Sequence, residues 1–348
     1  MSIIPTRLNG SATTGLRSSA KSEGQRGPSG RLGLGTVASL GVLAGLSSAV
    51  VALIGQARNA TRSIEAAAVE AALADGSLVP PSVPGGTAAQ QRLADHLVHV
   101  RLPQGEGVYE PDGGRRPDDA VVLELPGPNN RPLTLVMLGD STSVGYGTRT
   151  ADELPGVILA RGIAAHLNRP VRMRSHGLTG ARSSDLERQL KHAFADEPDI
   201  VVILVGANDI RDMVPPWRSA ALLGQTVAVL TSRHIPVVAG TCPDFGVIPG
   251  IPQPLRRMLG TWSLRLAALQ ERAVEEAGGA AVPLARLVSP QFVGRPDLFA
   301  PDQFHPSGAG YGRAMAVLVP AAIAEMDKVI IPAGTPDAAD PAVHPLSA

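Results

Sequence analysis

Three residue types that can cooperate in ester hydrolysis stand at widely separated positions of this chain. Ser141 ends a Gly-Asp-Ser sequence that follows the apolar run Leu133–Leu138, and Asp302 and His305 stand three residues apart far downstream. A hydroxyl becomes a useful nucleophile near neutral pH when an imidazole accepts its proton and a carboxylate orients that imidazole. The chain order Ser, Asp, His is one of several in which this geometry arises. The sequence therefore predicts a hydrolytic triad.

The residues after His305 predict that its imidazole sits on a loop. Pro306 follows directly, and a proline disfavours helical dihedral angles in the residue before it. Ser307 comes next and is suited to cap a following helix, because its hydroxyl can accept from a free backbone N–H. The short spacing between Asp302 and His305 lets one tight loop carry both groups.

Two further strand ends offer donors for the oxyanion that forms when a hydroxyl attacks an ester carbonyl. Gly180 lies in the turn after the second predicted strand, where a residue without a side chain lets a backbone N–H approach a ligand. Asn208 follows the third strand and can aim its amide N–H groups at the same oxygen. With the N–H of Ser141 they form a predicted oxyanion hole. We interpret the neighbouring Asp140 and Asp209 as partners of the local backbone.

Short apolar runs alternating with helical patterns must position these residues. The runs of strand length are Leu133–Leu138, Val171–Met173, Ile200–Val205, Val237–Ala239 and Ala280–Leu284. The helical patterns are Pro155–Leu167, Asp185–Phe194, Arg218–Arg233, Pro254–Ala277 and Gly308–Asp327. This alternation predicts a parallel sheet with both faces covered. Open sheets of this kind place their chemistry at the carboxyl ends of the strands, where Ser141, Gly180 and Asn208 fall.

Four short sequence blocks carry a resemblance to a known family: Gly-Asp-Ser after the first strand, Gly180 after the second, Gly-x-Asn-Asp at 206–209 after the third, and Asp-x-x-His-Pro at 302–306 before the last helix. In this order and on these strand ends they resemble the SGNH (GDSL-like) hydrolase family over about residues 131–328. The resemblance implies a flavodoxin-like, three-layer α/β/α sandwich with a five-stranded parallel sheet. It also implies the nucleophile Ser141, the base His305, the orienting Asp302 and the oxyanion donors Ser141, Gly180 and Asn208. Thr142 stands where the family's older name expects leucine, at a position that varies across the family. We expect no metal and no other cofactor.

The N-terminal part of the chain predicts a membrane segment. Residues 1–31 are rich in serine, glycine and arginine and predict a basic, disordered tail. The 24 residues of 32–55 carry no charge, and as a helix they cover roughly 36 Å, enough to cross a hydrocarbon core of roughly 30 Å. Positive charges precede this span, so the positive-inside rule puts the N-terminus in the cytoplasm and the later residues outside.

Three interpretations of this segment stay open: a retained signal anchor, a signal peptide cleaved near Gly55-Gln56-Ala57, and a buried helix of a soluble protein. The retained anchor is favoured, because the apolar stretch is longer than the usual core of a signal peptide and a long tail precedes it. An anchor followed by an outward-facing hydrolase also resembles membrane-anchored or secreted actinobacterial, especially mycobacterial, esterases of the same family.

We therefore divide the chain into five parts. These are a basic disordered tail (1–31), a transmembrane signal anchor (32–55), a stalk and loosely packed lead-in segment (56–130), a hydrolase domain (131–330) and a disordered tail (331–348). The formal net charge of zero argues against a nucleic-acid binder, which would show a basic face. The single cysteine, Cys242, excludes an intramolecular disulfide and a cysteine metal cluster.

The sequence thus predicts a serine esterase that hydrolyses carboxylic esters with short acyl chains or acetyl groups, through an acyl-enzyme, outside the cytoplasmic membrane. The expected partner is a small ester or an acylated glycan or lipid. Two other functions stay open: a carbohydrate O-acetyl esterase or acyltransferase acting on envelope glycans, and a non-catalytic envelope-binding protein. Trp217 and Phe304 are interpreted either as contacts of the acyl group or as core residues.

Overall fold

The computed structural model describes residues 102–117 and 131–330 without a gap, together with parts of 52–74 and the short strands at 78–79 and 99–100. The predicted tails and most of the predicted anchor lie outside the described residues. Among the helices that are described, none combines the length and the apolar character needed to cross a membrane.

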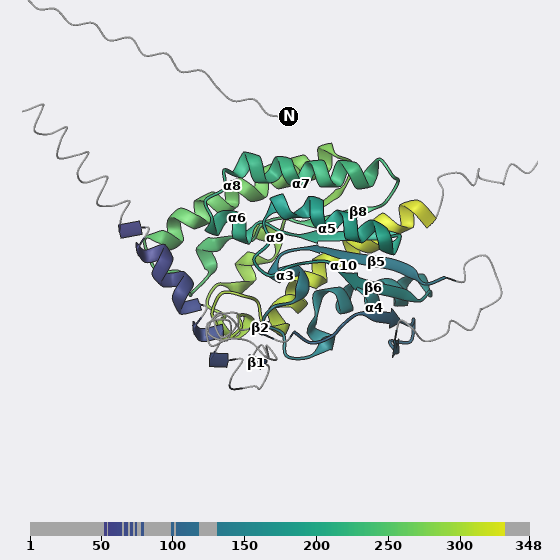
Figure 1. Ribbon diagram of the computed structural model, residues 1–348, viewed down its shortest axis with the longest axis horizontal. Helices are drawn as coiled ribbons and strands as arrows, with labels where there is room; N and C mark the ends of the chain where they lie inside the picture. The colour runs from purple at the N-terminus through teal and green to yellow at the C-terminus, as the bar shows by residue number, and fades with distance from the viewer. Residues whose placement is uncertain are drawn as a thin grey trace, which may run out of the picture. The chain divides into compact units, whose positions relative to one another are not determined.

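A sheet lies at the centre of the fold (Figure 1). It has seven strands, in the order β4-β3-β6-β5-β7-β8-β9. Five neighbouring strands run parallel: β6 (Val171–Ser175), β5 (Leu133–Gly139), β7 (Ile200–Leu204), β8 (Val237–Gly240) and β9 (Ala280–Val282). They correspond to the predicted apolar runs, with small shifts of their ends. A separate pair, β1 (Leu78–Val79) and β2 (His99–Val100), is antiparallel.

Two strands extend the sheet beyond β6, so the prediction of a five-stranded sheet is wrong in the number of strands. They are β3 (Gly107–Tyr109), antiparallel to β6, and β4 (Arg115–Arg116), antiparallel to β3. Both come from the segment interpreted as a loosely packed lead-in. Strands of three and two residues are too short to show an alternating pattern, and the glycines and aspartate between them indicate only a turn.

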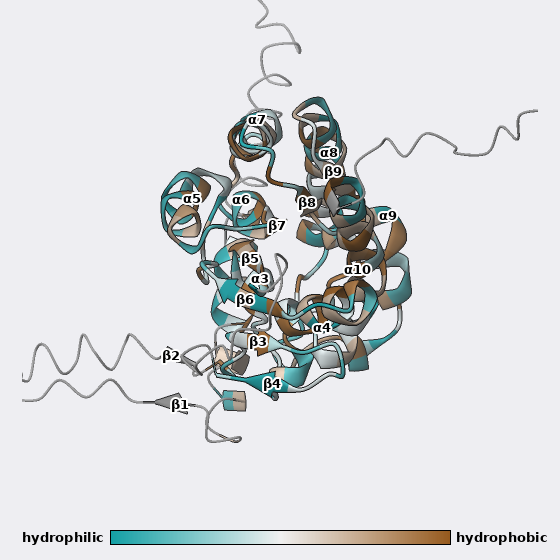
Figure 2. Cartoon of the chain, turned by 90° about the vertical axis from the view of Figure 1, so that its right-hand side faces the viewer, coloured by the Kyte–Doolittle hydropathy of each residue, from teal (hydrophilic) through white to brown (hydrophobic). Residues whose placement is uncertain are grey.

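Helices cover both faces of the sheet, which gives a three-layer α/β/α sandwich (Figure 2). The longer helices are α4 (Pro155–Leu167), α5 (Leu186–Ala193), α7 (Pro216–Thr231), α8 (Leu255–Glu276) and α10 (Gly308–Ile330). Short α-helices are α3 (Ser141–Val144), α6 (Ala207–Arg211) and α9 (Leu284–Leu287). Single 3-10 turns are η1 (Ala151–Glu153), η2 (Ser183–Asp185), η3 (Phe194–Asp196), η4 (Phe245–Val247), η5 (Ser289–Phe292) and η6 (Pro296–Leu298).

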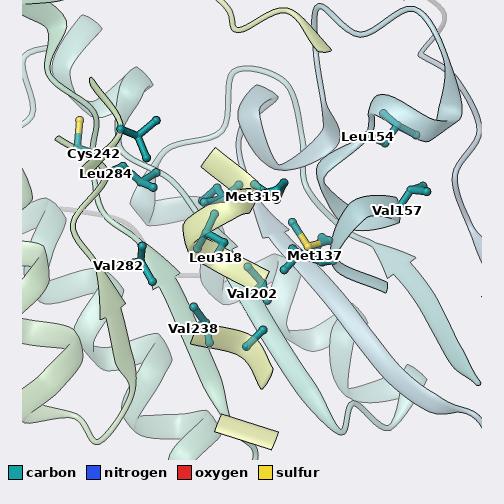
Figure 3. Close-up of a cluster of buried hydrophobic side chains, with 14 of the residues drawn as sticks. Met137, Leu154, Val157, Val202, Val238, Cys242, Val282, Leu284, Met315 and Leu318 are labelled. Atoms are coloured by element: carbon teal, nitrogen blue, oxygen red, sulfur yellow. The ribbon is translucent and has the colours of Figure 1, made fainter. Parts of the chain in front are cut away.

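The core lies on both sides of the central strands because successive strand residues point to opposite faces. Met137 and Val202 belong to the cluster of buried side chains under α4 and α10. Figure 3 shows these two side chains together with Met315 and Leu318 of α10, which belong to the same cluster. Leu138, next to Met137, belongs to the opposite cluster, which packs against α5 and α7. A continuous apolar run such as β5 is therefore buried on both faces.

Helical turns within residues 52–74 lie against this domain. Leu53 and Ala57 pack on the cluster that underlies α4 and α10, and the side-chain amide of Gln56 donates to the carbonyl of Gln253 (3.3 Å). The N-terminal helical turns therefore contact the segment that leads into α8.

Candidate active site

The turn between β5 and α3 places Ser141. Gly139, the last residue of β5, has a φ of +128°, and a Cβ there would lie 1.8 Å from the carbonyl oxygen of Leu204 on β7. The buried amide of Gln189 in α5 donates to the carbonyl of Gly139 (2.8 Å) and accepts from its N–H (2.7 Å). The close packing of β5 on β7 thus requires a glycine at this position. Gln189 holds the backbone of Gly139 in place, and the sequence pattern did not reveal this positioning residue.

Asp140 holds the first turn of α3. Its side chain accepts from the N–H of Thr142 (2.9 Å), and its carbonyl accepts from the hydroxyl of Ser143 (2.8 Å). Burial raises the pKa of the Asp140 carboxyl above its ordinary value, although the hydrogen bond from Thr142 works against that rise. Asp140 therefore acts on the backbone beside Ser141, as its neighbourhood in the sequence indicated.

The loop that carries Asp302 and His305 is closed at its base. Phe299 and Pro306 form an isolated antiparallel bridge. Within the loop, Oδ1 of Asp302 accepts from the backbone N–H groups of Phe304 (2.9 Å) and His305 (3.0 Å). One carboxylate oxygen is thus used to fix the loop, which leaves Oδ2 for the imidazole.

The expected helix cap follows this loop. The hydroxyl of Ser307 accepts from the N–H of Gly310 (3.3 Å) in the first turn of α10 and donates to the carbonyl of Asp297 (2.8 Å). The cap sets where α10 begins, so the position of His305 is fixed relative to the longest helix on that face of the sheet.

The fold brings Ser141, His305 and Asp302 together. Nε2 of His305 lies 2.9 Å from Oγ of Ser141, and Nδ1 lies 2.6 Å from Oδ2 of Asp302. Burial raises the pKa of Asp302, but the hydrogen bond and charge of His305 and the two backbone N–H groups outweigh it, so the pKa lies below its ordinary value. The carboxylate is therefore ionised at neutral pH. Nucleophile, base and orienting acid remain predicted roles, for which this geometry is suitable.

Aromatic residues that the sequence did not single out for this purpose hold the imidazole from the side. The Tyr146 ring lies 4.4 Å from that of His305, centroid to centroid, and the buried hydroxyl of Tyr311 donates to the Tyr146 carbonyl (2.8 Å). A Cβ at Gly147 would lie 2.6 Å from the Pro306 carbonyl oxygen. The glycine thus lets the loop after α3 pack directly on the histidine loop.

The two other predicted donors follow the strands on either side of β5. Asn208 is 7% exposed in α6, after β7, and its amide donates to the carbonyl of Ala181 (2.9 Å). Gly180 follows β6, has a φ of +83° and is exposed, with no atom within 4 Å of where a Cβ would be. The carboxylate of Asp209 accepts from the N–H of Ser183 (2.9 Å), which ties the Gly180 loop to α6. Asp209 is therefore a structural partner of that loop.

An apolar cavity of about 90 Å³ lies beside the histidine. Its walls include Thr142 of α3, His305, Phe245 in η4, Val288 and Phe292. Phe304 packs edge-on against Phe245 at a centroid distance of 5.8 Å, so it supports this wall. Trp217, in contrast, is 67% exposed at the start of α7 and is not a core residue.

A buried thiol lies at this site. Cys242 lines the same cavity, is buried, and has a thiol pKa that burial raises well above its ordinary value. In the described residues, no group of three or more His, Cys, Asp and Glu side chains is arranged to hold a metal ion.

Comparison with protein families places this site in a known group. Residues 137–313 match the family described as GDSL-like Lipase/Acylhydrolase. The chain belongs to this family. The matched range contains all the predicted site residues, from Ser141 to His305. GDSL-type esterase or acylhydrolase activity follows from this membership.

Individual proteins and solved structures are similar to this chain. The GDSL-like esterase Rv1075c of Mycobacterium tuberculosis is 38% identical over 242 residues, which are 66% of this chain and 75% of that protein. Among solved structures, the lipase/acylhydrolase from Enterococcus faecalis is 23% identical, covers 54% of this chain and 94% of its own, and gives a TM-score of 0.41. The extracellular lipase from Streptomyces rimosus is 19% identical, covers 54% and 99%, and gives 0.44.

We predict that Asp302→Asn makes the stability of the protein less dependent on pH at the acidic end. The pKa of Asp302 is lower in the folded than in the unfolded chain, where it is about 3.9. The ionised carboxylate therefore stabilises the fold at any pH above this unfolded-state pKa, and the stabilisation is lost as the pH falls through the lower pKa of the folded state. Near pH 7 the free energy of unfolding of the variant should be about 2 kcal/mol lower than that of the wild type, because charge-assisted hydrogen bonds are lost.

Urea unfolding of both proteins over an acid-to-neutral pH series measures this gap. The gap should be largest at neutral pH and close as the medium becomes acidic. A gap that widens in acid would show that the folded protein does not favour the ionised form of Asp302.

Proposed function

We propose that this GDSL-family protein is a serine esterase that hydrolyses esters of short carboxylic acids through an acyl-enzyme on Ser141. The observation that carries the proposal is the continuous chain of contacts from Ser141 Oγ through both ring nitrogens of His305 to Asp302. The relative from Mycobacterium tuberculosis, named an esterase, supports the same reaction class.

In the first half of the reaction, His305 Nε2 accepts the proton of Ser141 as Oγ forms a bond to the ester carbonyl carbon. Asp302 holds the other ring nitrogen and stabilises the imidazolium. The tetrahedral intermediate then breaks its bond to the alcohol oxygen, which takes the proton from His305. In the second half, the oxygen of a water molecule forms a bond to the acyl carbon while His305 takes a proton from that water. The second tetrahedral intermediate then breaks its bond to Ser141 Oγ, which takes the proton back from His305 as the acid leaves.

The oxyanion receives three donors in this proposal. The backbone N–H groups of Ser141 and Gly180 supply two. Asn208 supplies the third, because an amide NH₂ has two hydrogens and only one is needed for the bond to Ala181. That bond also fixes the orientation of the amide before substrate arrives, which is the condition for strong electrostatic stabilisation.

The acyl group enters the apolar cavity beside His305. At about 90 Å³ the cavity is smaller than the roughly 150 Å³ void that takes up benzene in another protein, so it suits a chain of a few carbons. Thr142 on its wall follows Ser141 directly, so an acyl group bound to Oγ has a short path into it.

The proposed location is the outer side of the cytoplasmic membrane, with the uncharged stretch of 32–55 as an anchor. The length of that stretch and the positive charges before it support this orientation. Association with the membrane therefore belongs to the proposal, and the ester substrate is one that reaches the cell envelope.

We predict that Ser141→Ala abolishes turnover of p-nitrophenyl butyrate, because no other hydroxyl is expected to form the acyl-enzyme. Purified wild type and variant are compared by release of nitrophenol and by labelling with a fluorophosphonate probe. Ser232→Ala, in an exposed serine that bonds the Val229 carbonyl at the end of α7, serves as the matched control and should keep both activities. Turnover at the wild-type rate in Ser141→Ala would remove this serine from the nucleophilic role.

Asn208→Ala should lower kcat by roughly 10²–10³ with a smaller effect on KM, because an oxyanion donor acts mainly in the transition state. Steady-state kinetics with the same butyrate ester measure this. A loss below about threefold, with the protein folded by circular dichroism, would contradict the assigned role.

A series of p-nitrophenyl esters from acetate through butyrate, hexanoate and octanoate to dodecanoate tests the acyl cavity. We expect kcat/KM to be highest among the short esters and to fall beyond about six carbons, where the cavity is full. Val288→Ala, which shortens a side chain of the cavity wall, should move the optimum toward longer chains. An optimum at dodecanoate in the wild type would show that the acyl chain lies elsewhere.

A further inference from the structure

The loop that carries Gly180 begins directly after β6 and first runs beside the end of β5. The backbone N–H of His176 donates to the carbonyl of Met137 (2.9 Å), and that of Leu178 donates to the carbonyl of Gly139 (3.0 Å). These two bonds continue the parallel pairing of β6 with β5. The start of the loop is therefore an extended segment beside the strand that leads to the proposed nucleophile.

One side of this extended segment packs on α3. A Cβ at Gly177 would lie 2.1 Å from the hydroxyl oxygen of Ser143, so no side chain fits between the loop and this helix. Because successive residues of an extended segment point to opposite sides, the side chain of His176 points away from α3. The contact with α3 limits how closely the loop approaches the nucleophile, but it does not prevent an outward movement.

The opposite side of the segment is held by Asp196, the last residue of η3. Nε2 of His176 lies 2.5 Å from Oδ2 of Asp196, and Nε of Arg174 lies 3.6 Å from Oδ1 of the same carboxylate. Arg174 stands on β6 two residues before His176, so both side chains reach the same side of the backbone. One carboxylate therefore joins the start of the loop to the segment that follows α5.

The His176–Asp196 pair is partly removed from water. The side chain of His176 is 25% exposed and that of Asp196 is 21% exposed. The ring of His192 lies 6.0 Å from that of His176, centroid to centroid, and covers the pair from α5. Pairs in such an environment are screened by salt much less than pairs on the surface. The bond is therefore suited to hold the loop in one position.

The tip of the loop has no comparable support of its own. Gly180 is exposed, and no atom lies within 4 Å of where its Cβ would be. The N–H of Ala181 closes the turn on the carbonyl of Leu178 (3.0 Å), and the carbonyl of Ala181 accepts from the amide of Asn208. The direction of the Gly180 N–H is thus set by the two ends of the loop, and the His176 side chain holds one of them.

We infer that His176 and Asp196 are positioning residues for the oxyanion donor Gly180. Their hydrogen bond keeps the loop where the Gly180 N–H points at the oxygen that becomes negatively charged. The inference rests on the proposed esterase function, in which Gly180 is one of three donors. Neither side chain contacts substrate in this role, so the pair acts on the rate of the chemical step and not on substrate binding.

Two substitutions of His176 separate its hydrogen bond from its bulk. His176→Leu removes the donor, and kcat for p-nitrophenyl butyrate should fall about tenfold with little change in KM, because a displaced donor acts mainly on the transition state. His176→Gln keeps an amide N–H that can reach Asp196, so kcat should recover to within about threefold of the wild type. Asp196→Ala should resemble His176→Leu, and the double variant should lose no more than either single variant, because one shared interaction is removed.

A second histidine–carboxylate pair in the same domain supplies the matched control. Nε2 of His166 lies 3.3 Å from Oδ2 of Asp327, and this pair joins α4 to α10 instead of holding the Gly180 loop. His166→Leu makes the same chemical change as His176→Leu. It should keep kcat within about twofold of the wild type.

A thionoester shows whether the loss occurs at the oxyanion. In p-nitrophenyl thionobutyrate, sulfur replaces the carbonyl oxygen, and sulfur is the weaker hydrogen-bond acceptor, so it gains less from the donors. The ratio of kcat/KM for the ester to that for the thionoester should fall about fivefold in His176→Leu. It should stay at the wild-type value in Asp302→Asn, which impairs proton transfer for both substrates.

Failure of this inference and failure of the esterase function give different results. Wild-type kcat in His176→Leu, an equal loss in His166→Leu, or a wild-type ratio of ester to thionoester in His176→Leu would overturn the positioning role, while hydrolysis of the butyrate ester by the wild type upholds the esterase. If circular dichroism shows that His176→Leu does not fold, Asp196→Ala is judged by the same three results. Absence of hydrolysis of both substrates by the wild type would overturn the esterase function and the positioning role together.

Discussion

The geometry of the proposed triad depends on a contact between two strand ends. β5 and β7 approach so closely at Gly139 that no side chain fits there, and the amide of Gln189 occupies both hydrogen-bonding groups of that residue. These contacts fix the backbone at the end of β5, and Asp140 then caps the helix α3, whose first residue is Ser141. The position of Ser141, the proposed nucleophile, is thus fixed by close packing of buried backbone.

His305, the proposed base, reaches Ser141 from a segment more than 160 residues away in sequence, and a second set of contacts holds it there. Gly147 lets the loop after α3 touch the histidine loop, and Tyr311 of α10 holds the carbonyl of Tyr146 beside it. These contacts join the element after β5 directly to the element before α10. The separation between hydroxyl and imidazole therefore does not depend on the long path of chain between them.

Sequence reasoning reached the parts of this structure that depend on local pattern. Buried parallel strands are continuous apolar runs, so β5 and β7 were visible, and the Pro-Ser pair after His305 indicated a loop followed by a capped helix. The positioning residue Gln189 was not visible, because a glutamine on an amphipathic helix gives no sign of which backbone it meets. β3 and β4 were missed because their pairing with β6 is a long-range contact between segments that look like turns.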